Sequence, residues 1–424
     1  MPNQFDNSGR AQTLLDRIRR ATDEVSFSKF FGKPYLAEGE HYRLCNLVLQ
    51  GGGTLGIAHL GFLRGLEAAN VRFAGLAGTS AGAIVALLVA AARKDQINRQ
   101  VADELLPILQ TMPAAAFMDG PYLSRRFVKF ALDKRRSGYL EYVLPALASV
   151  RQLLSRYGLN RGYRFEDWLA QVLSRTFDLR TQNELDALLA KVAVKLRTNG
   201  TSEANHLQLL HITATAMPIG LKIVFPQHAK LFHAKYAQRS PALFARASMS
   251  VPLFFEPLDV DISESAWNTF VDEPGQVDSY SDDVLRRMKL LRTLSFIDGG
   301  LLSNFPIDAF LGNAICGDTP TVGVALVSTR TSLGNAPRGS PAAFLEYAGA
   351  TVSAMRHLRD REGFARAQQV ELTSGIGTKV AFVDTGPHNW LNFNLPVDDM
   401  RDLYVRGLDG CAEFLERLCR EKQK

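Results

Sequence analysis

The sequence has few cysteines, no long hydrophobic run and little net charge. The 4 cysteines among 424 residues show neither a disulfide framework nor the spacing of metal ligands, and we expect no metal and a reducing compartment. The longest apolar run, Ala81 to Ala92, is too short to cross a bilayer. The N-terminus also lacks the apolar stretch of a secretory signal. These absences favour a cytoplasmic protein.

The balance of charge excludes one class of partner. Lys and Arg number 49 and Asp and Glu 43, which gives a formal net charge of +6. A dedicated nucleic-acid binder usually has a much larger excess, and we expect no nucleic acid as partner. The small excess is compatible with peripheral contact with an anionic membrane surface.

Apolar segments with strand and helix patterns alternate along the chain. This order predicts an α/β fold with a mostly parallel central sheet covered by helices on both faces. Strands are expected at Leu44–Leu49, Phe73–Ala77, Leu209–Met217, Leu221–Phe225, Thr293–Ile297, Val322–Ser328 and Lys379–Asp384. Helices are expected at Ala11–Glu24, Ile57–Glu67, Ala81–Arg93, Ala342–Glu371 and Val397–Arg420.

The chain divides into three parts. Residues 1–42 are predicted to form an N-terminal helical extension, and residues 43–330 a catalytic core. Within the core we expect a helical insertion at about 121–194 and an acidic surface loop at about 259–283, which contains Pro274-Gly275. Residues 331–424, mostly helical, would complete the domain.

A candidate nucleophile lies between a predicted strand and a predicted helix. The segment Gly78-Thr79-Ser80-Ala81-Gly82 has the pattern of a strained turn that exposes a serine hydroxyl. The following helix would place its positive end at Ser80. Taken alone, the pattern is equally compatible with a tight turn in which the serine is incidental.

A glycine run precedes this turn by one predicted strand and helix. Gly51, Gly52 and Gly53 follow an apolar strand, and their N–H groups could surround an anion. The pattern through Gly56 also matches a dinucleotide-binding loop, but the second strand ends in Ser80 rather than an acidic residue. A P-loop is excluded because no Lys-Ser or Lys-Thr pair follows. An oxyanion hole next to a nucleophile is therefore the better interpretation.

The serine needs a base, and Asp298 is the best candidate. It ends an apolar strand and precedes Gly299 and Gly300, at the kind of position where catalytic residues of parallel sheets gather. A turn-forming Asp-Gly is the structural alternative. His357 and His388 could instead complete a Ser–Asp–His triad, but neither lies in a recognisable loop at a strand end.

Three ordered motifs together resemble the patatin-like phospholipase family. They are Gly51 to Val89, Ala247 to Pro257 (ASMSVPLFFEP) and Asp298 to Pro306 (DGGLLSNFP). Two shorter segments, Gly158–Gly162 and Leu391–Phe393, are also similar, so that the resemblance covers most of the chain.

The resemblance implies a three-layer patatin-like fold and a lipid acyl hydrolase without a cofactor. Ser80 would be the nucleophile, Asp298 its base, and the amides of Gly51, Gly52 and Gly53 the oxyanion hole. The substrate would be a phospholipid or lysophospholipid. Further glycines would support these motifs, namely Gly56, Gly78, Gly82, Gly299 and Gly300.

One position departs from the family pattern. The family usually has Arg or Lys where this chain has Leu55, which leaves open a catalytically inactive lipid-binding regulator. A soluble-ester carboxylesterase or thioesterase of the same fold is the other alternative. His59 falls in the family's Gly-x-x-His-x-Gly helix and is expected to pack in the core.

Two basic clusters could contact a membrane. Six cations lie between Arg125 and Arg136, and four between Arg286 and Arg292. Solvated helix faces are the favoured interpretation, and an interfacial patch on anionic lipid is the alternative. Trp168 and Trp390 could be interfacial anchors or core residues.

Overall fold

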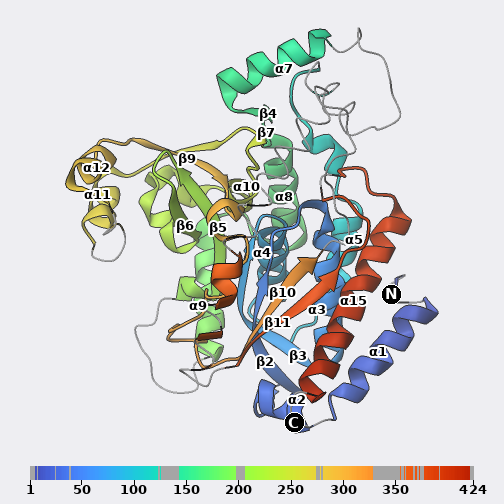
Figure 1. The fold of residues 1–424 in the computed structure, drawn as a ribbon. Coiled ribbons are helices and arrows are strands. Elements are labelled where there is room, and N and C mark those ends of the chain that lie inside the picture. Colours follow the sequence, from blue (N-terminus) through green and yellow to red (C-terminus); the bar gives the residue numbers. More distant parts are fainter. Residues whose placement is uncertain are drawn as a thin grey trace.

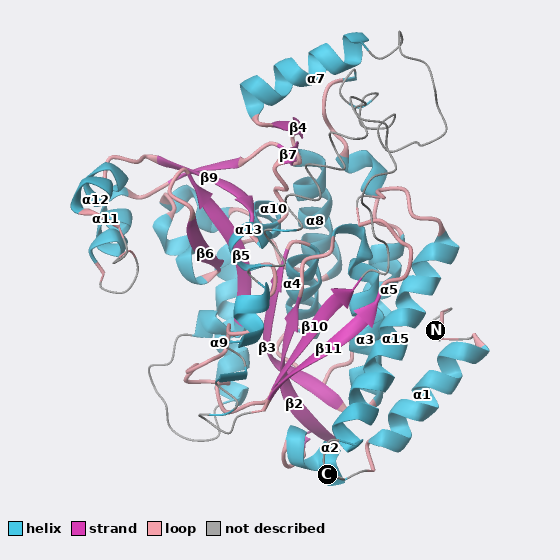
Figure 2. Cartoon of the chain, in the orientation of Figure 1, coloured by secondary structure: helices cyan, strands magenta, loops and turns pink. Residues whose placement is uncertain are grey.

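A nine-stranded sheet forms the centre of the molecule (Figures 1 and 2). The computed structural model describes residues 5–6, 8–23, 25–37, 40–122, 125, 143–196, 206–273, 277, 280–327, 354, 358, 360–365, 368–369, 372, 377–390 and 392–420. The main strand order is β11-β10-β2-β3-β5-β9-β8, with β1 beside β2 and β6 beside β5. The strands are β1 (Tyr35–Ala37), β2 (Glu40–Leu49), β3 (Val71–Thr79), β5 (Leu210–Met217), β6 (Leu221–Phe225), β8 (Leu258–Asp261), β9 (Thr293–Asp298), β10 (Thr321–Val327) and β11 (Thr378–Asp384).

The sheet has a parallel part and an antiparallel part. Strands β11, β10, β2, β3 and β5 run parallel, whereas β6 and β9 pair antiparallel with β5 and β8 pairs antiparallel with β9. The parallel strands are apolar and largely buried because helices pack on them. A separate two-stranded sheet joins β4 (Gly158–Asn160) to β7 (Leu253–Phe255). The predicted mostly parallel α/β fold is therefore confirmed.

Helices flank the sheet. They are α1 (Gly9–Ala21), α2 (Val25–Phe31), α3 (Ile57–Ala68), α4 (Ala81–Arg93), α5 (Ala102–Gln110), α7 (Val143–Arg156), α8 (Tyr163–Thr176), α9 (Gln182–Leu196), α10 (Ala242–Ser248), α11 (Glu264–Asp272), α12 (Asp282–Met288), α13 (Gly300–Ser303) and α15 (Val397–Arg420). Helix α4 is apolar on nearly every side, and it is almost wholly buried against β3 and β5.

The first and last helices of the chain pack together on one side of the molecule. Helix α15 packs on α3 and β11, and α1 lies alongside α15 (Figure 1). Leu14, Leu15 and Ile18 form the buried face of α1. On its outer side Arg17 binds Glu416 at 2.8 Å and Asp409 at 3.2 Å, so both packing and charge join the two helices.

The acidic segment at 259–283 is not the loop that the sequence suggested. Strand β8 pairs antiparallel with β9, and helices α11 and α12 follow it. The prediction was wrong because it missed an apolar face: Trp267, Phe270 and Val271 are buried at the spacing of one helix side. Pro274 and Gly275 lie outside the described residues.

The remaining predictions concern membrane spans, metal sites, cysteines and two segments of the chain. Among the described residues, no helix is long and apolar enough to cross a membrane, and no cluster of His, Cys, Asp and Glu could hold a metal. The four cysteines all lie among the described residues, and none of them forms a disulfide. Most of the predicted basic stretch up to Arg136, and most of the helix expected at Ala342–Glu371, lie outside the described residues.

Candidate active site

Ser80 occupies a strained turn between β3 and α4. Its backbone has φ +52° and ψ −117°, a region that residues with a side chain rarely adopt. The turn is possible because its two glycines lie against backbone. A Cβ on Gly78 would lie 2.3 Å from the Gly82 carbonyl carbon, and one on Gly82 would lie 2.2 Å from the Leu49 oxygen. The local sequence therefore fixes the position of this serine.

Asp298 lies one strand away from Ser80. Thr79 pairs with Thr213 on β5, and the next residue of β5, Ala214, pairs with Asp298 on β9. The Asp298 side chain is buried, and one carboxylate oxygen accepts a 2.7 Å hydrogen bond from the Gly300 N–H. The register thus places both predicted catalytic residues next to adjacent residues in the middle of β5.

The glycine after Asp298 allows these strands to close up. A Cβ on Gly299 would lie 2.1 Å from the Thr213 oxygen and 3.1 Å from the Thr79 methyl carbon. No side chain fits between β9 and the turn that carries Ser80. The Asp-Gly-Gly motif therefore has a steric function in addition to the carboxylate it carries.

Ser248, at the end of α10, connects the two segments that carry the predicted catalytic residues. Its hydroxyl accepts a 2.8 Å hydrogen bond from the Ser80 N–H, and its carbonyl accepts one of 3.2 Å from the Gly299 N–H. Two residues further on, the Ser250 carbonyl accepts a 2.8 Å hydrogen bond from the Asp298 N–H. The sequence marked this segment only through its likeness to a family motif, and assigned neither serine a role.

A buried arginine holds Ser250 in turn. The Arg246 guanidinium donates to the Ser250 hydroxyl and, at 2.8 Å, to the Glu256 carbonyl. Burial lowers the pKa of Arg246. A Cβ on Gly162 would lie 2.3 Å from this guanidinium, so the glycine leaves room for it.

The glycine loop passes directly over the nucleophile. A Cβ on Gly51 would lie 3.4 Å from the Ser80 Cβ. The N–H of Gly51 donates to the Asn304 carbonyl at 3.0 Å. Contrary to the prediction, this N–H therefore does not point toward a substrate. Among the described residues, neither the Gly52 nor the Gly53 N–H has a hydrogen-bond partner. These two amides, rather than all three, remain candidates for the oxyanion hole.

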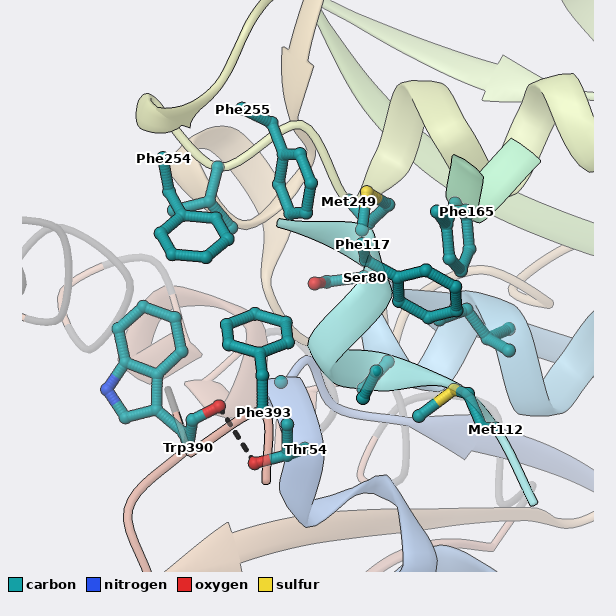
Figure 3. Close-up of a pocket in the computed structure, with 15 residues that line it drawn as sticks. Thr54, Ser80, Met112, Phe117, Phe165, Met249, Phe254, Phe255, Trp390 and Phe393 are labelled. Carbon is teal, nitrogen blue, oxygen red and sulfur yellow. Dashed lines mark hydrogen bonds between the residues drawn. The ribbon is translucent and has the colours of Figure 1, made fainter. Parts of the chain in front are cut away.

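Residues far along the chain hold this loop. Gly53 has φ +56°, and a Cβ there would lie 2.3 Å from the Trp390 carbonyl oxygen. The same oxygen accepts hydrogen bonds from the N–H and the hydroxyl of Thr54, both at 3.0 Å (Figure 3). A Cβ on Gly52 would lie 2.4 Å from a methyl carbon of Leu326.

His59 stabilises the start of the loop from the core. It is fully buried, and its Nε2 lies 2.8 Å from the Gln50 carbonyl, so this nitrogen carries the proton. Burial lowers the pKa of His59 to about 4, and the ring is neutral at pH 7. The residue packs in the core, as the sequence suggested. Leu55 is also buried, at the end of the same loop.

Of the two histidines considered for a triad, His388 is described by the structure, and it is not among the residues that line the pocket. His388 lies 2.9 Å from Asp402 of α15, with which it forms an ion pair when protonated. His357 lies outside the described residues. Among the described residues that line the pocket beside Ser80, none is a histidine.

An apolar pocket opens beside Ser80. The Ser80 hydroxyl points toward the space among the rings of Phe254, Phe255 and Phe393 (Figure 3). The rings of Phe254 and Phe393 stack with their centroids 4.8 Å apart. Most of the lining is aromatic or aliphatic: Gly53, Thr54, Ser80, Ala81, Ile84, Met112, Ala114, Phe117, Phe165, Met249, Val251, Phe254, Phe255, Trp390 and Phe393. Trp390 thus lines the pocket, while Trp168 packs against Phe117 and Phe165. Such a surface suits a hydrocarbon chain.

A protein family and two known proteins resemble this chain over more than half of its length. Residues 47–311 match the family described as "Patatin-like phospholipase". An uncharacterized protein of Bacillus subtilis (strain 168), YqhO, is 26% identical over 279 residues, which are 66% of this chain and 70% of that protein. The crystal structure of VipD from Legionella pneumophila covers 91% of this chain and 70% of VipD, at 15% identity and a TM-score of 0.40.

Proposed function

This chain belongs to the patatin-like phospholipase family, and we propose that it is a serine hydrolase that releases fatty acid from phospholipids or lysophospholipids. The observation that carries the proposal is the position of Ser80. It lies on a strained turn, under the glycine loop, and in the wall of an apolar pocket. A nucleophile, oxyanion donors and an acyl site thus adjoin one another.

In the first half-reaction, the Ser80 oxygen attacks the ester carbonyl carbon while Asp298 accepts the hydroxyl proton. Negative charge develops on the carbonyl oxygen, which the Gly52 and Gly53 N–H groups stabilise. The tetrahedral intermediate then loses its alcohol, which takes the proton from Asp298. In the second half-reaction, Asp298 removes a proton from water, which attacks the carbonyl carbon of the acyl-serine. As the bond to Ser80 breaks and the fatty acid leaves, Asp298 returns the proton to the Ser80 oxygen.

The pocket favours a lipid over a small soluble ester. Its aromatic lining would bury a long acyl chain, and each buried methylene contributes about 0.8 kcal/mol to binding. A short-chain ester would gain much less from this surface. The alternative is a soluble-ester carboxylesterase or thioesterase, and the substrate experiment below distinguishes it from a lipid hydrolase.

A labelling and turnover experiment tests the proposal. The full chain is treated with a fluorophosphonate probe, and fatty acid release from mixed-phospholipid and lysophospholipid vesicles is measured beside a soluble short-chain ester. We expect labelling and lipid hydrolysis, and expect Ser80→Ala to lose both with a loss of about 10⁴- to 10⁶-fold in kcat. Labelling without lipid hydrolysis would indicate the soluble esterase, and absence of labelling the inactive lipid-binding regulator.

Contact with the membrane belongs to the same proposal. On α7, Val150 and Leu154 are 52% and 76% exposed and lie four residues apart on one helix side, and Tyr157, the residue after the helix, is 69% exposed. Helix α7 leads into β4, which pairs with β7, and β7 carries Phe254 and Phe255 of the pocket. We expect Leu154→Ser to weaken sedimentation with anionic vesicles while hydrolysis of a soluble ester stays unchanged.

The second basic cluster supports membrane contact less well. Three of its cations have acidic partners: Arg287 with Asp283 at 3.1 Å, Lys289 with Asp272 at 2.6 Å and Arg292 with Glu264 at 3.1 Å. Paired cations on an exposed face are typical of a solvated surface. We therefore assign this cluster to the solvated surface.

A further inference from the structure

A buried carboxylate lies behind the glycine loop. Asp360 is 3% exposed, and a single oxygen of its side chain, Oδ2, accepts two hydrogen bonds. The donors are the side-chain amides of Gln50, at 2.7 Å, and Asn304, at 3.2 Å. Asp360 lies outside the residues that match the family, which end at 311.

The two donors stand on either side of Gly51. Gln50 precedes Gly51 in the chain, and the Asn304 carbonyl accepts the Gly51 N–H at 3.0 Å. Asn304 directly follows α13, the short helix that begins two residues after Asp298. One carboxylate oxygen therefore links the glycine loop to the segment that carries the proposed base.

The chemistry of a carboxylate decides how both amides are turned. An ionised carboxylate only accepts hydrogen bonds, so it selects the NH₂ end of each amide. For Gln50 this leaves the amide oxygen to accept the Leu326 N–H, which it does at 2.7 Å. Leu326 in turn packs beneath Gly52. The orientation of Gln50 thus reaches the backbone on which the proposed oxyanion donors lie.

From this arrangement we infer that Asp360 is a positioning residue for oxyanion stabilisation. It holds Gln50 and Asn304 in the orientation that directs Gly51 away from the substrate and leaves the Gly52 and Gly53 N–H groups available. Asp360 does not touch the substrate pocket, whose lining it does not join. This inference rests on the proposed function, because it concerns the same oxyanion site.

Two substitutions separate acceptor geometry from simple packing. Asp360→Leu keeps most of the volume but accepts no hydrogen bond, so both amides lose their partner. We expect kcat for a soluble ester to fall about 10- to 100-fold with little change in KM, short of the loss expected from removing an oxyanion donor outright. Asp360→Asn can present its amide oxygen at the position of Oδ2, and it should retain most of the wild-type kcat. Equal losses in the two variants would overturn the inference.

The affinity for two inhibitors gives a readout that a general loss of structure would not reproduce. A long-chain trifluoromethyl ketone forms an oxyanion on Ser80, whereas the matching ether analogue only fills the apolar pocket. Asp360→Leu should lower the affinity for the ketone by about the same factor as it lowers kcat, and should leave the affinity for the ether unchanged. If the affinities for both inhibitors fell equally, or if neither fell, Asp360 would not position the donors.

Controls distinguish this inference from the proposed function. Asp6→Leu removes another buried carboxylate, which binds Arg64 at 3.0 Å and accepts a 2.8 Å hydrogen bond from Tyr404, and it should lower the Tm without lowering kcat. Ser80→Ala is measured in parallel. If Ser80→Ala keeps full turnover, the proposed function fails. If it is inactive while Asp360→Leu behaves like wild type, only the inference about Asp360 fails.

Discussion

The serine turn and the glycine loop both adjoin Ser80, the proposed nucleophile, yet they are held in different ways. The turn depends mainly on residues near it in the sequence, because Gly78 packs against Gly82 and Gly82 against Leu49 at the end of β2. The loop depends on residues more distant in the sequence, among them Asn304, Leu326 and Trp390. The position of the proposed nucleophile is therefore encoded mainly by nearby residues, and that of the proposed oxyanion donors by long-range contacts.

This difference separates two kinds of mutational effect. A change at the serine turn or at Asp298 alters a reacting group and leaves the surrounding contacts in place. A change near the loop can act at a distance, since several parts of the chain meet there. The predictions below test this contrast.

Among the variants that keep Ser80, the largest effect on activity is expected from Asp298→Asn. The amide keeps the shape of the carboxylate and can still accept the Gly300 N–H, but it cannot take the serine proton. We expect kcat to fall by about 10² to 10⁴ with the Tm nearly unchanged. Turnover of a soluble ester and thermal unfolding, followed by circular dichroism, measure both quantities.

His388→Ala is the matched control for that variant. His388 binds Asp402 of α15 and is not among the described residues that line the pocket. Its replacement should leave most of the activity. If the histidine variant were as inactive as Asp298→Asn, a triad containing His388 would have to replace the proposed pair.

A smaller loss of activity is expected from Gly53→Ala in the loop. A methyl group there would lie 2.3 Å from the Trp390 oxygen and would displace the N–H donors. We expect a loss of about 100- to 1,000-fold in kcat, the effect of removing one oxyanion donor. Gly312→Ala is the control, because Gly312 also has a positive φ, +69°, but has no atom within 4 Å of a Cβ. It should lower stability and leave kcat unchanged.

The same contrast explains what the sequence could predict. The strand, turn and helix around Ser80 follow from adjacent apolar patterns and two glycines, and β3 and α4 were found close to their expected bounds. Asp298 was identifiable because its motif directly follows a strand. The strand register that brings it near Ser80 required the structure, since β5 and β9 are far apart in the sequence.

The parts that escaped prediction depend on long-range contacts. Nothing near Asp360 in the sequence points to Gln50, and nothing near Ser248 points to Ser80. The N–H of Gly51 was assigned to the oxyanion hole because a sequence cannot show that Asn304 already binds it. In the same way, the apolar face of α11 was hidden in an acidic segment.

The loop should also be the pH-sensitive part of the site. Burial lowers the pKa of His59 from 6.5 to about 4, so the folded protein binds this proton less readily than the unfolded chain. The neutral ring's contribution is complete above pH 6.5 and is lost as the pH falls toward 4, by about 3 kcal/mol in the free energy of unfolding. The pH dependence of the Tm should weaken in His59→Gln, whose amide can still donate to Gln50. An unchanged pH profile would show that other buried groups, such as His228, dominate it.

The smallest effect is expected from relieving strain at the serine turn. Ser80 has φ +52° and ψ −117°, and Ser80→Gly should raise the free energy of unfolding by about 1 kcal/mol, because glycine adopts this conformation without the steric cost. Lys94, at the other end of α4, has nearly the same conformation, with φ +52° and ψ −132°. Lys94→Gly should therefore stabilise the protein similarly and keep full activity, whereas Ser80→Gly loses all of it. If only the Lys94 variant were stabilised, the contacts of the Ser80 side chain would outweigh the strain of the turn.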